Sequence, residues 1–210
     1  MALTYCPIHF RTEWGNFCCL DWQLILCGIM SHQFHVAIDD ELFLTEFLDS
    51  DEARIVELLN DPAIYATTLR IPHPYHAKDA RFWIEYATKI HSELNSITNW
   101  AIRSKTQGLL GGIGLIFAEG IMHRVEIGYW IGKPFWGRGI ASRAVGRVER
   151  LCFEQFDFQK LTALVFSGNQ ASARVLEKNC FQKEGVLRNH FLKNGSFIDA
   201  ICFGKVAAKS

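Results

Sequence analysis

A strand-like apolar segment that runs into a glycine-containing turn is the part of the sequence best suited to chemistry. Residues 125–131 read VEIGYWI, and residues 132–142 continue as GKPFWGRGIAS. A strand that enters a Gly-x-Gly turn at the start of a helix directs several backbone N–H groups, and the positive end of the helix dipole, at one point. Gly137 and Gly139 carry no Cβ that would hold an anion away from those N–H groups. The segment therefore predicts a pyrophosphate site.

Two other phosphate-binding patterns fit this segment less well. A dinucleotide-binding fold would place a third glycine where Ser142 stands, and an acidic residue at the end of the following strand. Asp157 lies at about the right separation, but it precedes the next predicted strand. The chain also contains no G-x-x-x-x-G-K-[ST] motif. A nucleotide-binding oxidoreductase would therefore lack the acid that binds the ribose.

Alternating strand and helix patterns supply the elements that must position this turn. Asp49 and Glu52 form a predicted capping box at the start of a helix that ends at residues 60–62, and a helix with apolar residues from Ala80 to Leu94 follows. Two more helices are predicted over residues 139–156 and 170–179. The predicted strands cover residues 41–47, 99–103, 109–117, 124–131, 161–166, 183–192 and 197–206, with a hairpin turn at Asn194-Gly195. The order is β-α-α-β-β-β-α-β-α-β-β.

The composition is that of an ordinary globular protein. The chain has 210 residues, of which 49% are apolar and 21% charged, which excludes disorder and collagen-like repeats. Lys plus Arg and Asp plus Glu are each 22, so the formal net charge is zero. A balanced charge argues against a nucleic-acid partner held by overall positive charge.

Residues 1–38 differ from the rest, and we interpret them as an extension that is poorly ordered or packed as an accessory, preceding a domain over residues 39–210. The extension holds four of the seven cysteines. Its apolar stretch from Trp22 to Ile38 is interrupted by polar residues, and no secretory signal precedes it, so we expect a cytoplasmic protein with reduced thiols and no membrane partner. The spacings of its potential ligands match no zinc pattern, so we expect no metal; they are His9, His32, His35, Cys18, Cys19 and Cys27.

Three motifs in this order resemble those of the GNAT superfamily of acetyl-CoA-dependent N-acetyltransferases, over about residues 41–206. The segment Val125–Ile131 is similar to the family's central strand, and residues 136–141 (WGRGIA) are similar to its pyrophosphate loop. Residues 169–172 (NQAS) and 175–181 (VLEKNCF) are similar to its N-x-x-[AS] helix. Glu126 to Trp130, Ser172 and the Pro-His-Pro-Tyr loop are closest to the subgroup that acetylates the N-termini of ribosomal proteins at alanine or serine. The resemblance implies a mixed α/β (α+β), mostly antiparallel sheet of about seven strands flanked by four helices.

The resemblance also implies roles for single residues. Glu126 takes the position of a general base, the backbone N–H of Trp130 polarises the acetyl carbonyl, and Ser172 protonates the leaving thiol. The alternatives are that Glu126 is a strand-end carboxylate paired with Arg124, and that Ser172 is a surface hydroxyl without a role. The implied acetyl-CoA-binding residues are Tyr129, Trp130, Ile131, Trp136, Gly137, Arg138, Gly139, Ile140, Ala141, Ser142 and Asn169, with Arg143 flanking the phosphate loop.

Three positions depart from the family pattern. Pro134 takes the usual Gln or Arg position of the loop, Leu176 stands where other branches have a tyrosine proton donor, and Cys180 replaces the glycine before Phe181. The last change predicts a helix that ends with Asn179 in the left-handed region. These departures keep open an alternative function, a non-catalytic acyl-CoA-binding sensor or partner protein. For the enzyme, the acceptor is expected to be an amine, either a peptide N-terminus or a small molecule, and the chain a monomer or homodimer.

Overall fold

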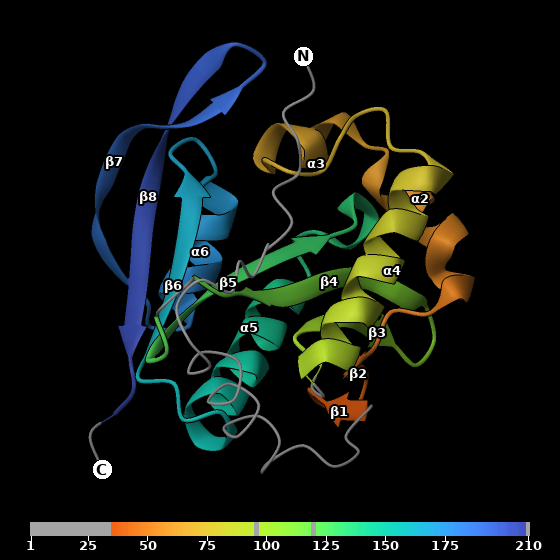
Figure 1. Cartoon of the computed structure of the whole chain (residues 1–210), viewed down its shortest axis with the longest axis horizontal. Helices are drawn as coiled ribbons and strands as arrows, with labels where there is room; N and C mark the ends of the chain where they lie inside the picture. Colours follow the sequence, from red (N-terminus) through yellow and green to blue (C-terminus); the bar gives the residue numbers. More distant parts are fainter. Residues whose placement is uncertain (1–34, 95–96, 119–120, 209–210) are drawn as a thin grey trace, which may run out of the picture.

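A single mixed sheet runs through the computed structural model of the chain, which describes residues 35–94, 97–118, 121–208 (Figure 1). The strand order is β1-β2-β3-β4-β5-β6-β8-β7, and every neighbouring pair is antiparallel except β5 and β6. The strands are β1 (His35–Ala37), β2 (Leu42–Thr45), β3 (Asn99–Ser104), β4 (Gly108–Ile116), β5 (Arg124–Ile131), β6 (Lys160–Phe166), β7 (Gln182–Lys193) and β8 (Ser196–Val206). The expected fold class, a mixed and mostly antiparallel sheet flanked by helices, is confirmed.

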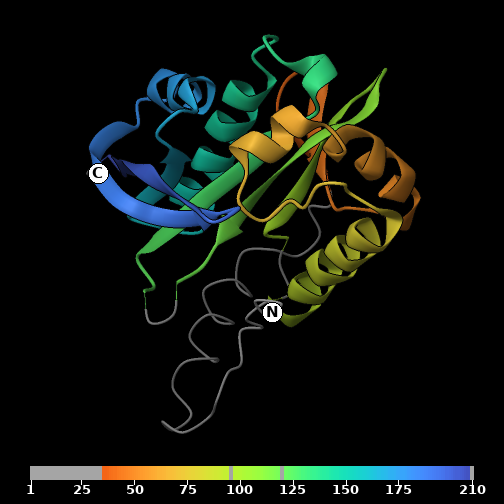
Figure 2. The ribbon, with the colours of Figure 1, turned by 90° about the horizontal axis from the view of Figure 1, so that it is seen from above.

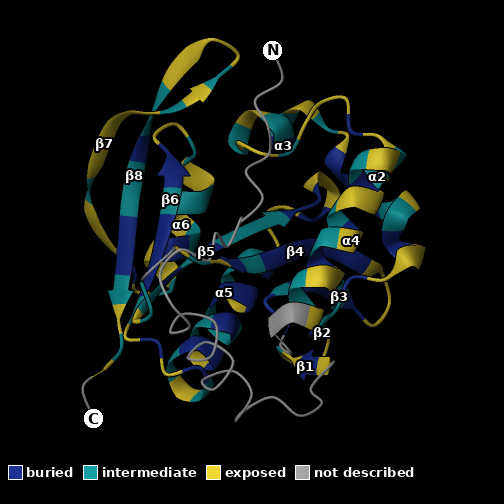
Figure 3. Ribbon diagram, in the orientation of Figure 1, coloured by how far each residue is buried: buried dark blue, intermediate teal, exposed yellow. Residues whose placement is uncertain are grey.

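Helices cover both faces of this sheet. The helix α4 lies on one face, and α5 and α6 lie on the other (Figure 2). The α-helices are α2 (Glu52–Leu59), α3 (Pro62–Thr67), α4 (Ala77–Leu94), α5 (Ile140–Arg150) and α6 (Gln170–Lys178). The strand β6 is largely buried and much of β8 is partly buried, whereas most of β7 at the sheet edge is exposed (Figure 3).

The parallel pair β5 and β6 separates after a short shared stretch. Their register joins Arg124 to Lys160, Val125 to Leu161 and Glu126 to Thr162, and it ends there. On its other side β5 stays paired with β4 up to Ile131. The second half of β5 therefore has a ladder on one side only, and the sheet opens into a V whose vertex is at Glu126.

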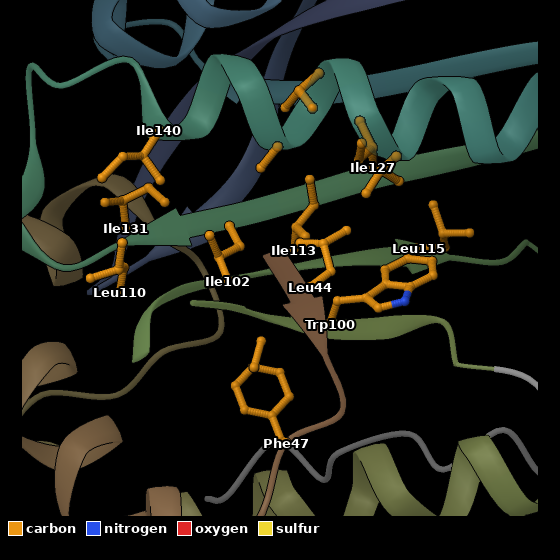
Figure 4. Close-up of a cluster of buried hydrophobic side chains, with 14 of the residues drawn as sticks. Leu44, Phe47, Trp100, Ile102, Leu110, Ile113, Leu115, Ile127, Ile131 and Ile140 are labelled. Atoms are coloured by element: carbon orange, nitrogen blue, oxygen red, sulfur yellow. The ribbon is translucent and has the colours of Figure 1, made fainter. Parts of the chain in front are cut away.

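The apolar core fixes which way the residues of β5 point. Ile127, Ile131 and Ile140 lie between β5 and α5, whereas Phe47 lies on the opposite side of the sheet (Figure 4). Phe47 contacts the Trp83 ring of α4 at 5.9 Å between centroids. The expected alternation is thus confirmed, with Val125, Ile127, Tyr129 and Ile131 on the α5 and α6 side, and Glu126 and Trp130 on the α4 side.

The start of the first helix differs from the prediction. Leu48, not Asp49, is the N-cap of a 3-10 turn (η1, Asp49–Asp51) that leads into α2, and Asp51 Oδ2 accepts a 2.8 Å hydrogen bond from its backbone N–H. Asp51 is 6% exposed and also receives both Nη atoms of Arg103, at 2.8 and 2.6 Å. Asp51 therefore takes the place in the capping box that the sequence assigned to Glu52. Its carboxylate is buried because it also pairs with Arg103 of β3.

The end of α6 also differs. Asn179 has a φ of −95°, and Cys180 is the residue in the left-handed region, at φ 61°. The backbone N–H of Cys180 donates to the Glu177 carbonyl and that of Phe181 to the Leu176 carbonyl, so the left-handed residue closes the helix one position later than predicted. Cys180 thus adopts the backbone conformation that glycine favours.

The remaining differences are small elements. The strand β1 and the helix α3 were not predicted; Pro62 at the first position of α3 and the Asp61 side chain, which accepts from Ala63 N at 2.7 Å, start that helix. The helix predicted over residues 139–156 ends in a π-helical turn (η3, Leu151–Gln155).

Most of the expected extension, residues 1–34 with His9 and His32, lies outside the described residues. Among the described helices, none has the length and apolar character needed to cross a membrane.

Candidate active site

The turn between β5 and α5 presents a row of backbone N–H groups. Gly137 and Gly139 have φ values of 78° and 72°, in the left-handed region that glycine favours. Within the described part of the chain, none of the N–H groups of residues 137–142 donates to a protein acceptor. A Cβ built at either glycine meets no atom within 4 Å, so the space in front of these groups is open. Open N–H groups at a helix N-terminus suit a phosphate.

Trp136 holds this turn at the end of β5. Its indole Nε1–H donates to the Ile131 carbonyl at 2.6 Å, and the 3-10 turn η2 (Lys133–Phe135) buries Phe135 beneath it. Pro134 is the second residue of that turn and stiffens it. The exposed ring of Trp136 remains at the surface beside the open N–H groups.

The arginines that flank the turn have protein partners. Arg138 lies over the Phe135 ring at 5.4 Å and donates to the Pro134 carbonyl at 3.1 Å and to Gln107 Oε1 at 3.3 Å. Arg143 pairs with Asp39 at 2.7 Å. Both side chains are exposed, so these contacts leave each guanidinium with further donors.

Contacts between α5 and α6 fix the open side of the V. The Asn179 side-chain amide donates to Ser142 Oγ at 3.1 Å and to the Val175 carbonyl at 2.8 Å. Asn169 is the N-cap of α6, since its Oδ1 accepts from the Ser172 N–H at 3.1 Å. Asn169 thus caps α6 through its Oδ1, and its amide nitrogen makes no hydrogen bond within the described residues.

Tyr129 reaches from β5 to the first turn of α6. Its Oη lies 2.8 Å from Ser172 Oγ, where either atom serves as the donor, and it donates to the Ser172 carbonyl at 3.2 Å. Burial raises the pKa of Tyr129 to about 12, although the hydrogen bond to Ser172 acts in the opposite direction. Tyr129 therefore stays protonated at neutral pH, and the two hydroxyls form a proton-donating pair.

Glu126 stands at the vertex of the V, on the opposite face of β5 from Tyr129. Within the described residues its carboxylate forms neither a hydrogen bond nor an ion pair, so the pairing with Arg124 is absent. Burial raises the pKa of Glu126, and the nearby charges of Arg70, Arg124 and His190 lower it by smaller amounts. An unpaired, half-buried carboxylate with a raised pKa is suited to accepting a proton.

The end of α3 and the β7–β8 hairpin contact each other. In Figure 1 the hairpin rises next to α3, where Tyr65 Oη donates to Asn194 Oδ1 at 2.6 Å. Lys193 Nζ donates to the carbonyls of Tyr65 and Thr68 and lies 3.7 Å from the centroid of the Tyr65 ring. The hairpin turn adopts positive φ at Asn194 and Gly195, 51° and 76°, as its sequence predicts.

An acetyltransferase (GNAT) domain model matches residues 41–182 of this chain. The chain belongs to the GNAT acetyltransferase family. An uncharacterized N-acetyltransferase of Bacillus subtilis, YoaA, is 30% identical over 167 residues, which are 79% of this chain and 93% of YoaA. The family match and this relative identify the chain as an acetyl-CoA-dependent acetyltransferase.

Solved GNAT structures share the fold at low identity. The microcin C7 self-immunity acetyltransferase MccE, solved with acetyl-CoA and AMP, has a TM-score of 0.75 at 19% identity, covering 83% of this chain and 97% of MccE. RimL, a ribosomal L7/L12 α-N-protein acetyltransferase solved with coenzyme A, has a TM-score of 0.74 at 19% identity, covering 82% and 98%. The expected resemblance to ribosomal-protein acetyltransferases is thus confirmed at the level of the fold.

The GNAT fold brings most of the predicted residues around one V. Its mouth is formed by the loop of residues 136–142, one wall by the Tyr129 and Ser172 pair, and its vertex by Glu126. Sequence reasoning missed the Tyr129 hydroxyl, which it assigned to acetyl-CoA binding without its bond to Ser172. It also missed the electrostatic effect of Arg70 and His190 on Glu126, because these residues are distant from Glu126 in the sequence. His73 and His76, in the loop before α4, are exposed, and the ring centroids of His73 and Tyr65 lie 5.6 Å apart.

Proposed function

We propose that the chain transfers the acetyl group of acetyl-CoA to a primary amine, on a protein N-terminus or a small molecule, by direct attack of the amine. The observation that carries this proposal is the position of Glu126 where the β5–β6 ladder ends. There an unpaired carboxylate adjoins an open strand edge that leads to the N–H groups of residues 137–142.

Acetyl-CoA supplies a thioester whose carbonyl an amine nitrogen attacks. The N–H groups from Gly137 to Ser142 would hold its pyrophosphate, and Trp136 keeps them in place through Ile131. The open edge of β5 has the backbone groups of Tyr129 and the N–H of Ile131 free to pair with the pantetheine arm, as an added strand would, whereas Trp130 lies opposite Gly112 of β4 and the Ile131 carbonyl accepts from Trp136. The amide nitrogen of Asn169 is available to the same arm while its Oδ1 caps α6.

Proton transfer involves both faces of β5. An alkylamine with a pKa near ~10 is almost fully protonated at neutral pH, so a base is needed at the acceptor. Glu126 takes that proton, and its raised pKa makes it a stronger base than an ordinary glutamate. Ser172 Oγ–H donates to the leaving thiolate, and Tyr129 Oη–H restores the serine proton through their 2.8 Å contact. Solvent carries the second proton that the amine loses on becoming an amide back to Tyr129, and Glu126 releases the first to solvent. By resemblance to the family, the backbone N–H of Trp130 would polarise the carbonyl once its pairing with Gly112 of β4 opens.

The acceptor would enter from the face of β5 that carries Glu126. RimL, which shares this fold, acts on the N-terminus of a ribosomal protein. A peptide N-terminus or a free amine is therefore the acceptor class that we propose. Cys152, Cys180 and Cys202 are free thiols, which is consistent with a cytoplasmic enzyme.

A binding titration followed by product analysis tests this function. Acetyl-CoA at ~100 times its Kd should stabilise the chain by about 2.7 kcal/mol, whereas NAD and ATP should not shift its Tm. Mass spectrometry of amines incubated with the enzyme and acetyl-CoA should show a gain of one acetyl group. Binding without any acetylated amine would instead favour a non-catalytic acyl-CoA-binding protein, and absence of binding would contradict both functions.

A further inference from the structure

The side-chain amide of Asn179 links the end of α6 to the first turn of α5. Its Nδ2 donates to the Val175 carbonyl at 2.8 Å and to Ser142 Oγ at 3.1 Å. A carbonyl only accepts hydrogen bonds, so the contact with Val175 identifies this atom as the amide nitrogen. An amide nitrogen has two protons to donate and accepts none, so Ser142 Oγ is the acceptor in the second contact. The proton of the serine is therefore not used between α5 and α6.

That serine proton has no acceptor within the described part of the chain. The hydrogen bond from Asn179 is the one contact that Ser142 Oγ makes there. A serine in a helix often donates to the carbonyl one turn earlier, and among the described residues this hydrogen bond is absent for Ser142. The backbone N–H of Ser142 is one of the open groups of residues 137–142. The hydroxyl is thus a further free donor beside those groups.

Gly146, one turn after Ser142, makes room for the Asn179 amide. A Cβ built at Gly146 would lie 2.9 Å from Asn179 Oδ1, closer than Cβ atoms approach other atoms in proteins. A glycine inside a helix costs about 1 kcal/mol relative to alanine. Gly146 lies within α5 and has no positive φ that would require a glycine. The close approach of Asn179 therefore accounts for the glycine at this position.

An ion pair between β8 and α5 holds the backbone of Asn179. Lys205 Nζ lies 2.6 Å from Glu149 Oε1 and donates to the Asn179 carbonyl at 2.9 Å. The side chains of Lys205 and Glu149 are 24% and 14% exposed. A lysine at a helix C-terminus satisfies a carbonyl that has no partner within the helix. The side chain of Asn179 is thus fixed through Val175 and its backbone through Lys205.

Ser142 and Asn179 both line a cavity of about 380 Å³ between α5, the end of α6 and the turn after β1. Arg143, Arg150 and Asp39 also line this cavity. Arg143 pairs with Asp39 at 2.7 Å, so two arginines face one carboxylate and the charge around the cavity is positive. A positively charged cavity beside a free hydroxyl proton suits a phosphate.

We propose that Asn179 is a positioning residue for acetyl-CoA, because its hydrogen bond to Ser142 Oγ directs the serine proton to a phosphate oxygen of that ligand. This proposal rests on the acetyl transfer proposed above, since it requires acetyl-CoA at the turn of residues 136–142. Asn179 does not touch the ligand itself. The phosphate is either the pyrophosphate or the 3′-phosphate of acetyl-CoA, and the O–H donor serves both in the same way.

A double-mutant cycle measured by calorimetric titration of acetyl-CoA tests the coupling of the two residues. Ser142→Ala should raise the Kd about tenfold, because a hydrogen bond to a charged group is lost. Asn179→Ala should raise it about fivefold, and the double variant should match Ser142→Ala alone, since Asn179 acts through the hydroxyl. Ser142→Thr keeps the hydroxyl and should bind like the wild type. An equal loss from Asn179→Ala with and without Ser142→Ala would overturn the proposal, because it would show an effect on helix packing alone.

The matched control is Gln159→Ala. The Gln159 amide also donates to two acceptors, the carbonyl and Oδ1 of Asp157 at 3.0 and 3.2 Å. These contacts lie just before β6, after the far end of α5. Gln159→Ala should leave the acetyl-CoA Kd unchanged, and a Kd raised as much as in Asn179→Ala would contradict the assigned role.

Ligands with fewer phosphates identify the group that Ser142 binds. The ratio of the Kd of Asn179→Ala to that of the wild type is measured for CoA, dephospho-CoA and pantetheine, with pantetheine followed by displacement of CoA. We expect a raised ratio for CoA and a ratio near one for pantetheine. A ratio near one for dephospho-CoA assigns the 3′-phosphate, and a raised ratio assigns the pyrophosphate. A ratio for pantetheine as high as that for CoA would overturn the proposal.

Gly146→Ala moves the Asn179 amide without removing it, so it serves where Asn179→Ala does not fold. The new methyl group displaces the end of one side chain, whereas alanine favours the helix. The acetyl-CoA Kd should rise about threefold in Gly146→Ala, and Gly146→Ala should add nothing to Ser142→Ala. An unchanged Kd in Gly146→Ala would overturn this inference while leaving acetyl transfer intact. Absence of acetyl-CoA binding by the wild type would overturn the proposed function as well.

Discussion

Tyr129 Oη and Ser172 Oγ lie 2.8 Å apart and join the open half of β5 to the first turn of α6. The contact crosses the side of the V on which Ile127 and Ile131 pack against α5, and Glu126 lies on the other face of the same strand. Tyr129 and Glu126 thus project from opposite faces of one strand, and Ser172 of α6 lies on the Tyr129 side. The base for the amine and the proton donor for the thiolate therefore do not exchange a proton directly.

Tyr129→Phe should lower kcat by about tenfold with little change in the acetyl-CoA Kd. A tenfold loss corresponds to about 1.4 kcal/mol, the strength of one hydrogen bond at the reacting group. Ser172→Ala should have the larger effect, and the double variant should resemble Ser172→Ala alone, since Tyr129 acts through the serine. Steady-state kinetics of the three variants measure this coupling, and additive losses would show that the hydroxyls act independently.

Gly139→Ala should weaken acetyl-CoA binding by at least about tenfold. The left-handed backbone costs an alanine about 1–2 kcal/mol, and the new methyl group enters the open space in front of the N–H groups. Gly195→Ala is the matched control, because Gly195 has a φ of 76° and equally open surroundings in the hairpin turn. Calorimetric titration should show a raised Kd for Gly139→Ala only, although both variants lose stability. Equal affinities in the two variants would contradict the phosphate-binding role of the turn.

Glu126→Gln should make the protein more stable at pH 7 to 8. Because burial raises the pKa of Glu126 in the folded state, the folded chain holds its proton to higher pH than the unfolded chain. The wild type thus loses stability as pH rises from about 4.3, the ordinary glutamate pKa, through the raised value. Glutamine does not ionise, so the variant does not lose this stability as the pH rises. Thermal unfolding should give the variant a higher Tm at neutral pH, with the difference disappearing below about pH 4.

The control for this comparison is Glu85→Gln, which removes the same charge from an exposed site on α4. A Tm advantage of Glu126→Gln that is the same at pH 4 and pH 8, relative to this control, would show that ionisation of Glu126 is not its cause.

Cys180→Gly should stabilise the protein by about 0.5–1 kcal/mol. Cys180 is exposed and has a φ of 61°, where a Cβ is strained and glycine is not. The gain is partly offset by the greater freedom of glycine in the unfolded chain. Cys180→Ala keeps the Cβ and should bring no gain. Urea unfolding of both variants measures the difference, and a destabilised Cys180→Gly would refute the strain at this position.

Local sequence patterns were sufficient for most of the elements and for the backbone conformation of the turn at Gly137 and Gly139. The strand over residues 124–131 has the predicted bounds, and Gly137 and Gly139 adopt the left-handed conformation that their place in the turn requires. The alternation along β5 also placed Glu126 and Tyr129 on opposite faces. These features depend on residues close in sequence, so a period or a turn motif is enough to reveal them.

Features that depend on distant residues could not be predicted. Asp51 replaced Glu52 in the capping box because Arg103, on a strand far along the chain, needs a buried acid. The contact of Tyr129 with Ser172 requires knowing that α6 covers that face of β5. The end of α3 and the β7–β8 hairpin meet through Lys193 and Tyr65. The spacing of residues within a single segment does not reveal contacts between segments that are distant in the sequence.

The turnover of Glu126→Gln tests the central claim most directly. Glutamine has nearly the same shape and keeps the phosphate turn intact, so acetyl-CoA should bind with the wild-type Kd. Without the base, kcat at saturating acetyl-CoA should fall at least about 100-fold at pH 7, and recover in part at high pH, where the amine loses its proton unaided. This result would establish Glu126 as the base of the acetyl transfer. Unchanged turnover at pH 7 with normal acetyl-CoA binding would contradict the account.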